Sequence, residues 1–409
     1  MLYENRVGKE GNRIMRQDFP SRSWAEIDLD ILASNMKAIR EMTNPQAKVM
    51  AVVKADAYGH GAIEVSKVLL ENGADKLAVS MLDEAIELRN HAITAPILIL
   101  GHTDPRRISE LIHHDIEQTV YSLDYAKAVS AAAVEEGKTA RIHIKYDTGM
   151  NRLGFLEGES SIESILSISK LPGIAVEGMF SHFSMADTND DEYTMRQFNR
   201  FQAMGEALEA KGLHVPTKHI CNSAGIIRFP QMHLDMVRAG LIVYGMMPEG
   251  CPVPYKDFNI RPAMTLKSSV VHVKTLAAGE SVSYGRNFKT EKESVIATIA
   301  IGYADGYARR LSNCAKMLMG GKRVPVVGNI CMDMCMVDAT ELQTKPKVSD
   351  EVVLFGHQSG PNGTDEISVD EISAALGTIN YEITCLIGKR IPRVYLRNGE
   401  IVHMHSCIW

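Results

Sequence analysis

The sequence lacks a long hydrophobic segment. No apolar run approaches the roughly 18 residues that suggest a membrane span, and residues 294–304, among the longest, form a short one. Residues 1–17 mix charges throughout and lack the apolar core of a secretory signal. We therefore expect a cytoplasmic protein with no membrane partner.

Basic excess, disulfide spacing and nucleotide-binding glycine motifs are also missing. The 44 basic and 50 acidic residues leave a net charge of −6, which is not the footprint of a nucleic-acid-binding protein. The seven cysteines are odd in number, and the spacing of Cys331 and Cys335 matches no zinc pattern, so we predict neither a disulfide framework nor a metal site. No Walker or Rossmann glycine fingerprint is present. With nucleic acid and nucleotide disfavoured, we expect the partner to be another small molecule.

What the chain does contain is material for two domains. From residue 23 to 261, short apolar runs alternate with helical patterns, which predicts parallel strands closed into an N-terminal (β/α)8 TIM-type barrel. Nine strand candidates are one too many, and we expect the first, residues 24–29, to pair elsewhere. Residues 262–409 carry β-branched runs separated by turns, which predicts a C-terminal, mostly antiparallel β domain with one helix near residues 368–377. Residues 1–22 are interpreted as a polar N-terminal extension. The expected fold class is therefore α/β plus β.

Polar side chains follow five of the predicted barrel strands. They are Lys54, Lys145, Asp147, His182, Asn222, Ser223 and Arg238. Each alone has an ordinary structural explanation, because a lysine that leaves a strand usually reaches water through its flexible stem. Together they lie on the face where barrel enzymes build their active sites, which predicts a catalytic site there.

The lysine suggests a particular chemistry. Burial destabilises an ammonium, so a lysine at the end of an apolar strand can act as an amine nucleophile toward an aldehyde and form a Schiff base. Ser223 and the backbone of residues 238–241 could donate hydrogen bonds to a phosphate, a group that barrels often bind after their last strands. A reactive lysine beside a phosphate site predicts pyridoxal phosphate as the cofactor.

Nine motifs together resemble bacterial alanine racemase, a fold-type III pyridoxal-phosphate enzyme. In chain order they are VVKADAYGHG, KYDTGMNRLGF, FSHFSMAD, CNSAG, VRAGLIVYG, SYGRNF, IGYADGY, GNICMDM and INYE. The resemblance runs from about residue 23 nearly to the end. It implies a homodimeric isomerase that interconverts L-alanine and D-alanine, a peptidoglycan precursor, in active sites shared between subunits.

The resemblance also implies a role for each matching position. Lys54 would carry the cofactor as an aldimine and act as one acid/base, and Tyr284 from the second subunit would act as the other. Arg238 would face the pyridine nitrogen, and His182 would connect Arg238 to Tyr284. The cofactor-binding residues would be Lys54, Tyr58, His182, Asn222, Ser223, Arg238, Gly240, Leu241 and Tyr381. The substrate-binding residues would be Arg152, Met332, Lys145 and Tyr303, and the entrance would be lined by Asp187, Arg309 and Tyr381. In many family members the lysine matching Lys145 is carbamylated and buttresses the arginine.

These roles agree with elementary chemistry. Inversion at Cα needs a proton-transfer group on each face of the cofactor, so a second base beside Lys54 is expected. An arginine can only donate hydrogen bonds, so Arg238 would leave the pyridine nitrogen neutral and disfavour transamination. Three alternatives stay open: significant serine activity, since an apolar pocket rejects an added hydroxyl weakly; a barrel-type pyridoxal-phosphate decarboxylase; and a carrier that binds the cofactor without turnover.

Overall fold

The computed structural model describes residues 22–248, 250–253 and 258–406, so the predicted extension lies outside the described residues except for Arg22. The chain divides into two compact units. The barrel unit comprises residues 27–265 and 368–388, and the β unit comprises the described residues of 22–26, 266–367 and 389–406.

The barrel unit is built on an eight-stranded parallel sheet with the order β8-β7-β6-β5-β4-β3-β2-β9. Its strands are β2 Lys48–Val52, β3 Lys76–Val79, β4 Ile97–Ile99, β5 Glu117–Val120, β6 Ala140–Lys145, β7 Ile174–Phe180, β8 Thr217–His219 and β9 Met236–Ala239. The sheet comes close to closing between β8 and β9, where the Asp235 N–H donates to the Lys218 carbonyl over 3.2 Å and the Arg238 N–H donates to the Cys221 carbonyl over 3.0 Å. The predicted barrel is confirmed.

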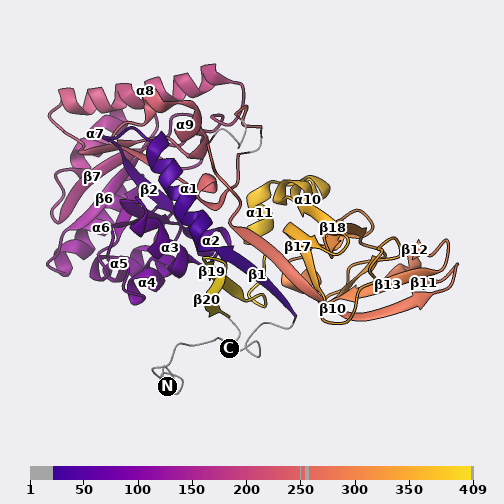
Figure 1. The fold of residues 1–409 in the computed structure, drawn as a ribbon. Helices are drawn as coiled ribbons and strands as arrows, with labels where there is room; N and C mark the ends of the chain where they lie inside the picture. The colour runs from indigo at the N-terminus through magenta and orange to yellow at the C-terminus, as the bar shows by residue number, and fades with distance from the viewer. Residues whose placement is uncertain (1–21, 249, 254–257, 407–409) are drawn as a thin grey trace. The chain divides into compact units, whose positions relative to one another are not determined.

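The longer helices lie around the outside of the barrel (Figure 1), whereas the short segments α2 and α9 lie at the strand ends. Their bounds are α1 Leu29–Met42, α2 Lys54–Tyr58, α3 Ala62–Glu71, α4 Leu82–Asn90, α5 Ile108–His113, α6 Leu123–Glu135, α7 Glu159–Ile168, α8 Asp191–Ala210 and α9 Ser223–Arg228. Side-chain caps fix where several begin: Asp28, Ser122, Asp190 and Asn222 each accept a backbone N–H of the first turn that the helix itself cannot bond.

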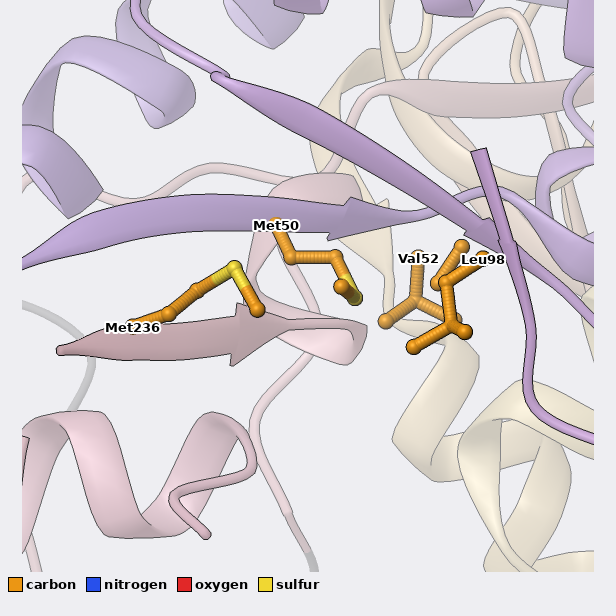
Figure 2. Close-up of a cluster of buried hydrophobic side chains, with 5 residues drawn as sticks. Met50, Val52, Leu98 and Met236 are labelled. Atoms are coloured by element: carbon orange, nitrogen blue, oxygen red, sulfur yellow. The ribbon is translucent and has the colours of Figure 1, made fainter. Parts of the chain in front are cut away.

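One part of the barrel interior is apolar. Met50, Val52, Ala78, Leu98 and Met236, from strands β2, β3, β4 and β9, form a buried cluster. Figure 2 shows the two methionine side chains between β2 and β9, and Val52 beside Leu98. Tyr58 and Leu100 pack against this cluster. Unbranched methionine side chains fill the irregular space that branched residues would leave.

The β unit contains a ten-stranded sheet in the described part of the chain, and the pairs that join its strands from β10 onward are antiparallel. Its strands are β1 Ser23–Asp28, β10 Met264–Leu276, β13 Ser294–Ile299, β14 Lys316–Met319, β15 Lys322–Pro325, β16 Cys335–Asp338, β17 Glu351–Gly360, β18 Gly363–Ile367, β19 Arg393–Arg397 and β20 Glu400–His405. A separate pair joins β11 Ser281–Val282 to β12 Phe288–Lys289. Because β1 lies in this sheet, the first strand candidate, residues 24–29, does pair outside the barrel, as predicted.

Two helices stand where one was expected. Helices α10 Val369–Leu376 and α11 Asn380–Cys385 follow each other and group with the barrel unit. Asn380 holds the start of α11 by donating to the Met247 carbonyl over 2.9 Å and to the Asp370 carboxylate over 2.8 Å. Helix α11 approaches α2 so closely that a Cβ on Gly59 would lie 2.1 Å from the Thr384 carbonyl oxygen. Nowhere in the described ranges is a helix both long and apolar enough to cross a membrane.

Candidate active site

A cavity of about 750 Å³ lies at the C-terminal ends of the barrel strands. The predicted site residues that line it are Lys54, Tyr58, Lys145, Arg152, His182, Asp187, Asn222, Ser223, Arg238, Gly240, Leu241 and Tyr381. All of them belong to the barrel unit. The strand ends therefore bring together side chains that are far apart in the sequence, as the parallel topology requires.

Lys54 begins an unusual backbone segment. Ala55, Asp56, Ala57 and Tyr58 have φ between 52° and 54°, in the left-handed region that costs a non-glycine residue about 1–2 kcal/mol. Hydrogen bonds hold this turn: the Ala55 N–H donates to the Glu84 carboxylate, and the Asp56 carboxylate accepts the Ala62 N–H, both over 2.7 Å. Strain of this kind persists where the surroundings over-determine it, often at functional sites.

The amine of Lys54 is partly buried. Burial lowers its pKa below the ordinary value, and the positive charge of Arg152 lowers it further, whereas Glu84 and Cys385 act in the opposite direction. A larger share of the side chain is therefore the free amine than in water. This is the form that can attack an aldehyde or accept a proton.

Hydrogen-bonding groups converge at one place on the cavity wall. The Gly240 N–H donates to the Ser223 hydroxyl over 3.1 Å, and a Cβ on Gly240 would lie 3.3 Å from the Tyr58 hydroxyl. Burial raises the pKa of Tyr58, so its hydroxyl keeps its proton and can donate. The Tyr381 ring meets Tyr58 edge-on, with ring centroids 6.3 Å apart. Two hydroxyls beside a glycine that has no Cβ to fill the space between them suit a phosphate.

Arg238 is 3% exposed and is held on several sides. Its guanidinium donates to the Ser181 carbonyl over 2.7 Å, to the Ile220 carbonyl over 3.0 Å and to His182 Nδ1 over 3.1 Å. Burial lowers the pKa of Arg238 to about 10, so the group stays charged at neutral pH. Burial, together with this charge, lowers the pKa of His182 well below its ordinary value. His182 is therefore a neutral imidazole that accepts at Nδ1.

Lys145 and Arg152 line the cavity on the neighbouring side. Burial lowers the pKa of Lys145 to about 7, aided by the charges of Arg238 and Arg152, and its amine donates to the Tyr146 carbonyl over 3.1 Å. Asp147, also predicted at this rim, accepts the backbone N–H groups of Gly149, Asn151 and Arg152 over 2.9–3.0 Å. Asp147 thus shapes the loop that presents Arg152.

The remaining predicted residues belong to the β unit. Tyr284 starts a short 3-10 helix, Tyr284–Arg286, and is 69% exposed. Tyr303 and Met332 lie on two loops joined by backbone hydrogen bonds, of which the Ala304 N–H to the Met332 carbonyl measures 3.0 Å. Arg309 donates to the Ile330 carbonyl over 3.2 Å.

An ion-pair cluster fixes the first of these loops. Asp305, which is fully buried, accepts two hydrogen bonds of 2.9 Å from Arg22 and lies 3.3 Å from the Arg390 guanidinium. Its carboxylate also accepts the Gly302 N–H over 3.0 Å. Because Gly302 and Asp305 flank Tyr303, the cluster holds the backbone of that tyrosine in place.

Gln197 is a supporting residue that the sequence did not reveal. Its amide oxygen accepts the Ser184 N–H over 3.0 Å, and its amide nitrogen donates to the Thr148 hydroxyl over 3.2 Å and to the His182 carbonyl over 3.1 Å. It therefore ties together two of the loops that form the site. One signal could have found it: Gln197 interrupts the buried, otherwise largely apolar face of α8.

Comparisons with known proteins agree with this arrangement. The family models for the N-terminal and C-terminal domains of alanine racemase match residues 27–248 and 263–395. The chain is 49% identical over 385 residues to the alanine racemase of Clostridium novyi (strain NT), covering 94% of this chain and 98% of the relative. The corresponding enzyme of Methanococcus maripaludis is 49% identical over 373 residues, with coverage of 91% and 98%.

Solved structures give the same result. An alanine racemase of Clostridium difficile 630 superposes with a TM-score of 0.89 at 42% identity, covering 95% of this chain and 99% of that one. The alanine racemase of Bartonella henselae, solved with covalently bound pyridoxal phosphate, superposes with a TM-score of 0.81 at 27% identity, covering 92% and 100%.

Proposed function

The chain belongs to the alanine racemase family, and from this premise we propose that it interconverts L-alanine and D-alanine with pyridoxal 5'-phosphate bound in the barrel cavity. The observation that carries the proposal is the convergence, in one cavity, of an amine with a lowered pKa, a buried arginine and a cluster of hydrogen-bond donors. The relatives named alanine racemase support the substrate.

The cavity residues suit each part of the cofactor. The phosphate would be held by the hydroxyls of Tyr58 and Ser223, with the backbone of Gly240 and Leu241, and with Asn222 and Tyr381, beside them. The amine of Lys54 would hold the aldehyde carbon, and Arg238 would face the ring nitrogen. When bound, pyridoxal phosphate supplies an electron-withdrawing ring that stabilises the negative charge left at Cα of an amino acid.

Proton transfer on one face falls to Lys54. Its lowered pKa makes the free amine available to accept the Cα proton of one enantiomer or, in the reverse direction, to deliver a proton that re-forms that same enantiomer. The opposite face needs a second group, which we assign to Tyr284 of the second subunit in a homodimer. Its 69% exposure on the β unit is compatible with insertion into a partner's cavity.

Arg238 would determine which reaction follows proton removal, and Arg152 would orient the substrate. A guanidinium cannot accept a proton, so Arg238 would keep the ring nitrogen unprotonated and favour the return of the proton to Cα. Arg152 presents a planar pair of donors that suits the substrate carboxylate, with Lys145 beside it and the Met332 backbone from the β unit. Fixing the carboxylate aims the Cα–H bond at one base or the other.

The substrate must pass the residues that we place at the entrance. Tyr381 and Asp187 line the cavity itself, and we propose that Tyr303 and Arg309 complete the entrance. Crowding by two tyrosines leaves room for a methyl side chain. An added hydroxyl is rejected only weakly by such a pocket, so slow serine racemisation is expected.

The test is D-alanine formation from L-alanine by the wild type and by Lys54→Ala and Tyr284→Phe variants. Tyr284→Phe should keep the absorbance of lysine-bound cofactor but lose about 10²–10⁴ in the exchange of the L-alanine Cα hydrogen with solvent. The control is Tyr121→Phe, which removes a partly exposed hydroxyl that pairs with His102 outside the cavity lining. Carbon dioxide release would instead identify a decarboxylase, and cofactor absorbance without exchange would identify a carrier.

Mixing the two variants tests the shared site. If Lys54 and Tyr284 come from different subunits, a mixed dimer has one intact site and one doubly altered site, so an equal mixture should regain about a quarter of the wild-type rate. If both groups came from one chain, every site of the mixed dimer would carry one lesion. No recovery after verified subunit exchange would therefore refute the shared site.

A further inference from the structure

A chain of hydrogen bonds runs through the barrel from Arg238 to an ion pair at the other end. Arg238 lies 3.0 Å from His219 Nδ1, His219 Nε2 lies 3.0 Å from His143 Nδ1, and His143 Nε2 lies 3.0 Å from the Glu117 carboxylate. The same carboxylate oxygen lies 2.6 Å from the Lys76 amine. Both histidines are fully buried, and Glu117 is 3% exposed.

The path crosses the barrel along its axis. Lys76 and Glu117 are the first residues of β3 and β5, so they lie at the N-terminal end of the parallel sheet. His219 is the last residue of β8, and Arg238 lines the cavity at the opposite end. Besides the apolar cluster, the barrel interior therefore contains a polar path whose hydrogen bonds lead from one end of the barrel to the cavity.

The backbone makes room for this path. Strand β6 pairs with β7 through an irregularity between Ile142 and His143, which brings His143 opposite Gly178. A Cβ at Gly178 would lie 2.4 Å from His143 Nδ1, a separation that atoms do not tolerate. The glycine therefore allows the imidazole to lie inside the barrel, where no water is needed to satisfy it.

Every bond in the chain has a defined direction. Arg238 only donates, so His219 accepts at Nδ1 and carries its proton at Nε2. That proton is donated to His143 Nδ1, which leaves the proton of His143 on Nε2, pointing at Glu117. A carboxylate only accepts, so the direction required at Glu117 is the same as the direction required at Arg238. Burial and nearby charge lower the pKa values of both imidazoles, which keeps each one neutral with a single proton.

We propose that Glu117 is a positioning residue that acts through His143 and His219 to fix the hydrogen bonding of Arg238 at the cavity. As an acceptor-only group it permits one tautomer of each histidine, and that tautomer presents a lone pair to the guanidinium. Within the described ranges no carboxylate bonds to Arg238 directly, so the two imidazoles are its link to a negative charge. The effect on racemisation rests on the proposed function, whereas the tautomer pattern does not.

Because Glu117 is ionised, the opposite tautomers, with both histidine protons on Nδ1, are excluded. Burial alone would raise its pKa, but the hydrogen bond from His143 and the charge and hydrogen bond of Lys76 act the other way and hold the pKa below its ordinary value. If the group at 117 could donate, His143 could carry its proton on Nδ1, and His219 would then carry its proton on the nitrogen that faces Arg238. Two donors would meet, and the arginine would have to move or lose that partner.

Glu117→Gln tests the inference because glutamine has nearly the same shape but can also donate. In selectively ¹⁵N-histidine-labelled protein without cofactor, the wild type should show the protons of His143 and His219 on Nε2. Glu117→Gln should show a second population with the protons on Nδ1, and Glu117→Asp, which still only accepts, should restore the wild-type pattern. Unchanged tautomers in Glu117→Gln would overturn the proposal.

The matched control is Glu26→Gln in the β unit. Glu26 also pairs with a lysine, at 3.0 Å from the Lys267 amine, and its other side-chain oxygen accepts a hydrogen bond from the Trp24 indole and not from a histidine. It should lose stability without any change in histidine tautomers or turnover.

Kinetics provide the second measurement. Glu117→Gln should lower kcat for alanine at least about tenfold, the size of effect known for outer-shell partners of metal ligands, with KM changed by less than about twofold. A purely structural role would change stability and leave kcat per folded site intact, which would overturn the positioning role. Wild-type protein with the expected tautomers but no racemase activity would refute the proposed function and leave the hydrogen-bond pattern standing.

Discussion

Substituting Gly59 with alanine should damage the barrel unit more than any ordinary glycine-to-alanine change. Gly59 has φ of 83°, and its Cβ would lie 2.1 Å from the Thr384 carbonyl oxygen and 2.9 Å from the Thr384 carbonyl carbon. These are backbone atoms, so no side-chain rotation can relieve the contact. Helix α11 must move away from α2, or the left-handed turn that follows Lys54 must deform.

The loss in the free energy of unfolding expected for Gly59→Ala has two parts. Placing alanine at positive φ costs about 1–2 kcal/mol, and forcing a methyl group into filled space costs about 1–3 kcal/mol more. Gly212 isolates the first part, because its φ of 86° nearly equals that of Gly59 while nothing lies within 4 Å of its Cβ position. Gly212→Ala should therefore reduce the free energy of unfolding by about 1–2 kcal/mol. Gly59→Ala should reduce it by the backbone cost and the packing cost together.

Thermal and urea unfolding of the two variants, measured side by side, give the difference. At about 2 °C or more per kcal/mol for a domain of this size, Gly59→Ala should melt about 2–6 °C below Gly212→Ala. It should also lose at least about tenfold in kcat/KM, because Lys54 and Tyr381 lie on the two displaced segments and a 1 Å misplacement can cost about a hundredfold. Equal melting temperatures and equal activity would show that α11 does not press on α2.

Two further predictions concern charged groups. The pKa of Lys145 is lowered to about 7 in the folded protein, so between pH 7 and its unfolded value near 10.5 the unfolded chain binds more protons than the folded one. The free energy of unfolding should therefore rise with pH across that window. Urea unfolding at several pH values should show a smaller rise for Lys145→Met than for the wild type. Arg22→Met should cost about 2–4 kcal/mol in a denaturation experiment because it removes two bonds from the buried Asp305 carboxylate. Arg106→Met, which breaks the exposed pair with Asp104, should cost much less than Arg22→Met, and equal losses would contradict the role of burial.

The rim residues were predictable because the rule that locates them is geometric. Parallel strands end on one face, so Lys54, His182 and Arg238 could be placed together from the sequence pattern alone. Their hydrogen bonds could not be placed, since these depend on side-chain directions that no spacing records.

The polar interior was not predicted, for a related reason. Glu117, His143 and His219 each interrupt or border a short apolar run, where a single polar residue is usually a satisfied structural group. Their partners are 26 and 76 residues away along the chain, so nothing local identifies them.

The segment after Lys54 shows the limits of local propensity. Alanine and tyrosine rarely adopt positive φ, and the more tolerant Asp56 stands between two alanines, so residues 55–58 carried no clear signal for a left-handed turn. Helix α11 was missed because its six residues are too few to show a helical period. Both features are imposed by tertiary contacts.

The polar path inside the barrel constrains how this protein can change over time. Removing Glu117, His143 or His219 alone leaves a neighbouring donor or acceptor without a partner in a dry interior, at a cost of about 1–3 kcal/mol. Replacing all three with apolar groups of similar shape escapes that cost only if Lys76, the ion-pair partner of Glu117, changes as well, and any single intermediate step does not escape it. The three positions and Gly178 should therefore vary together among relatives. A substitution at one of them should be tolerated only where the others have already changed.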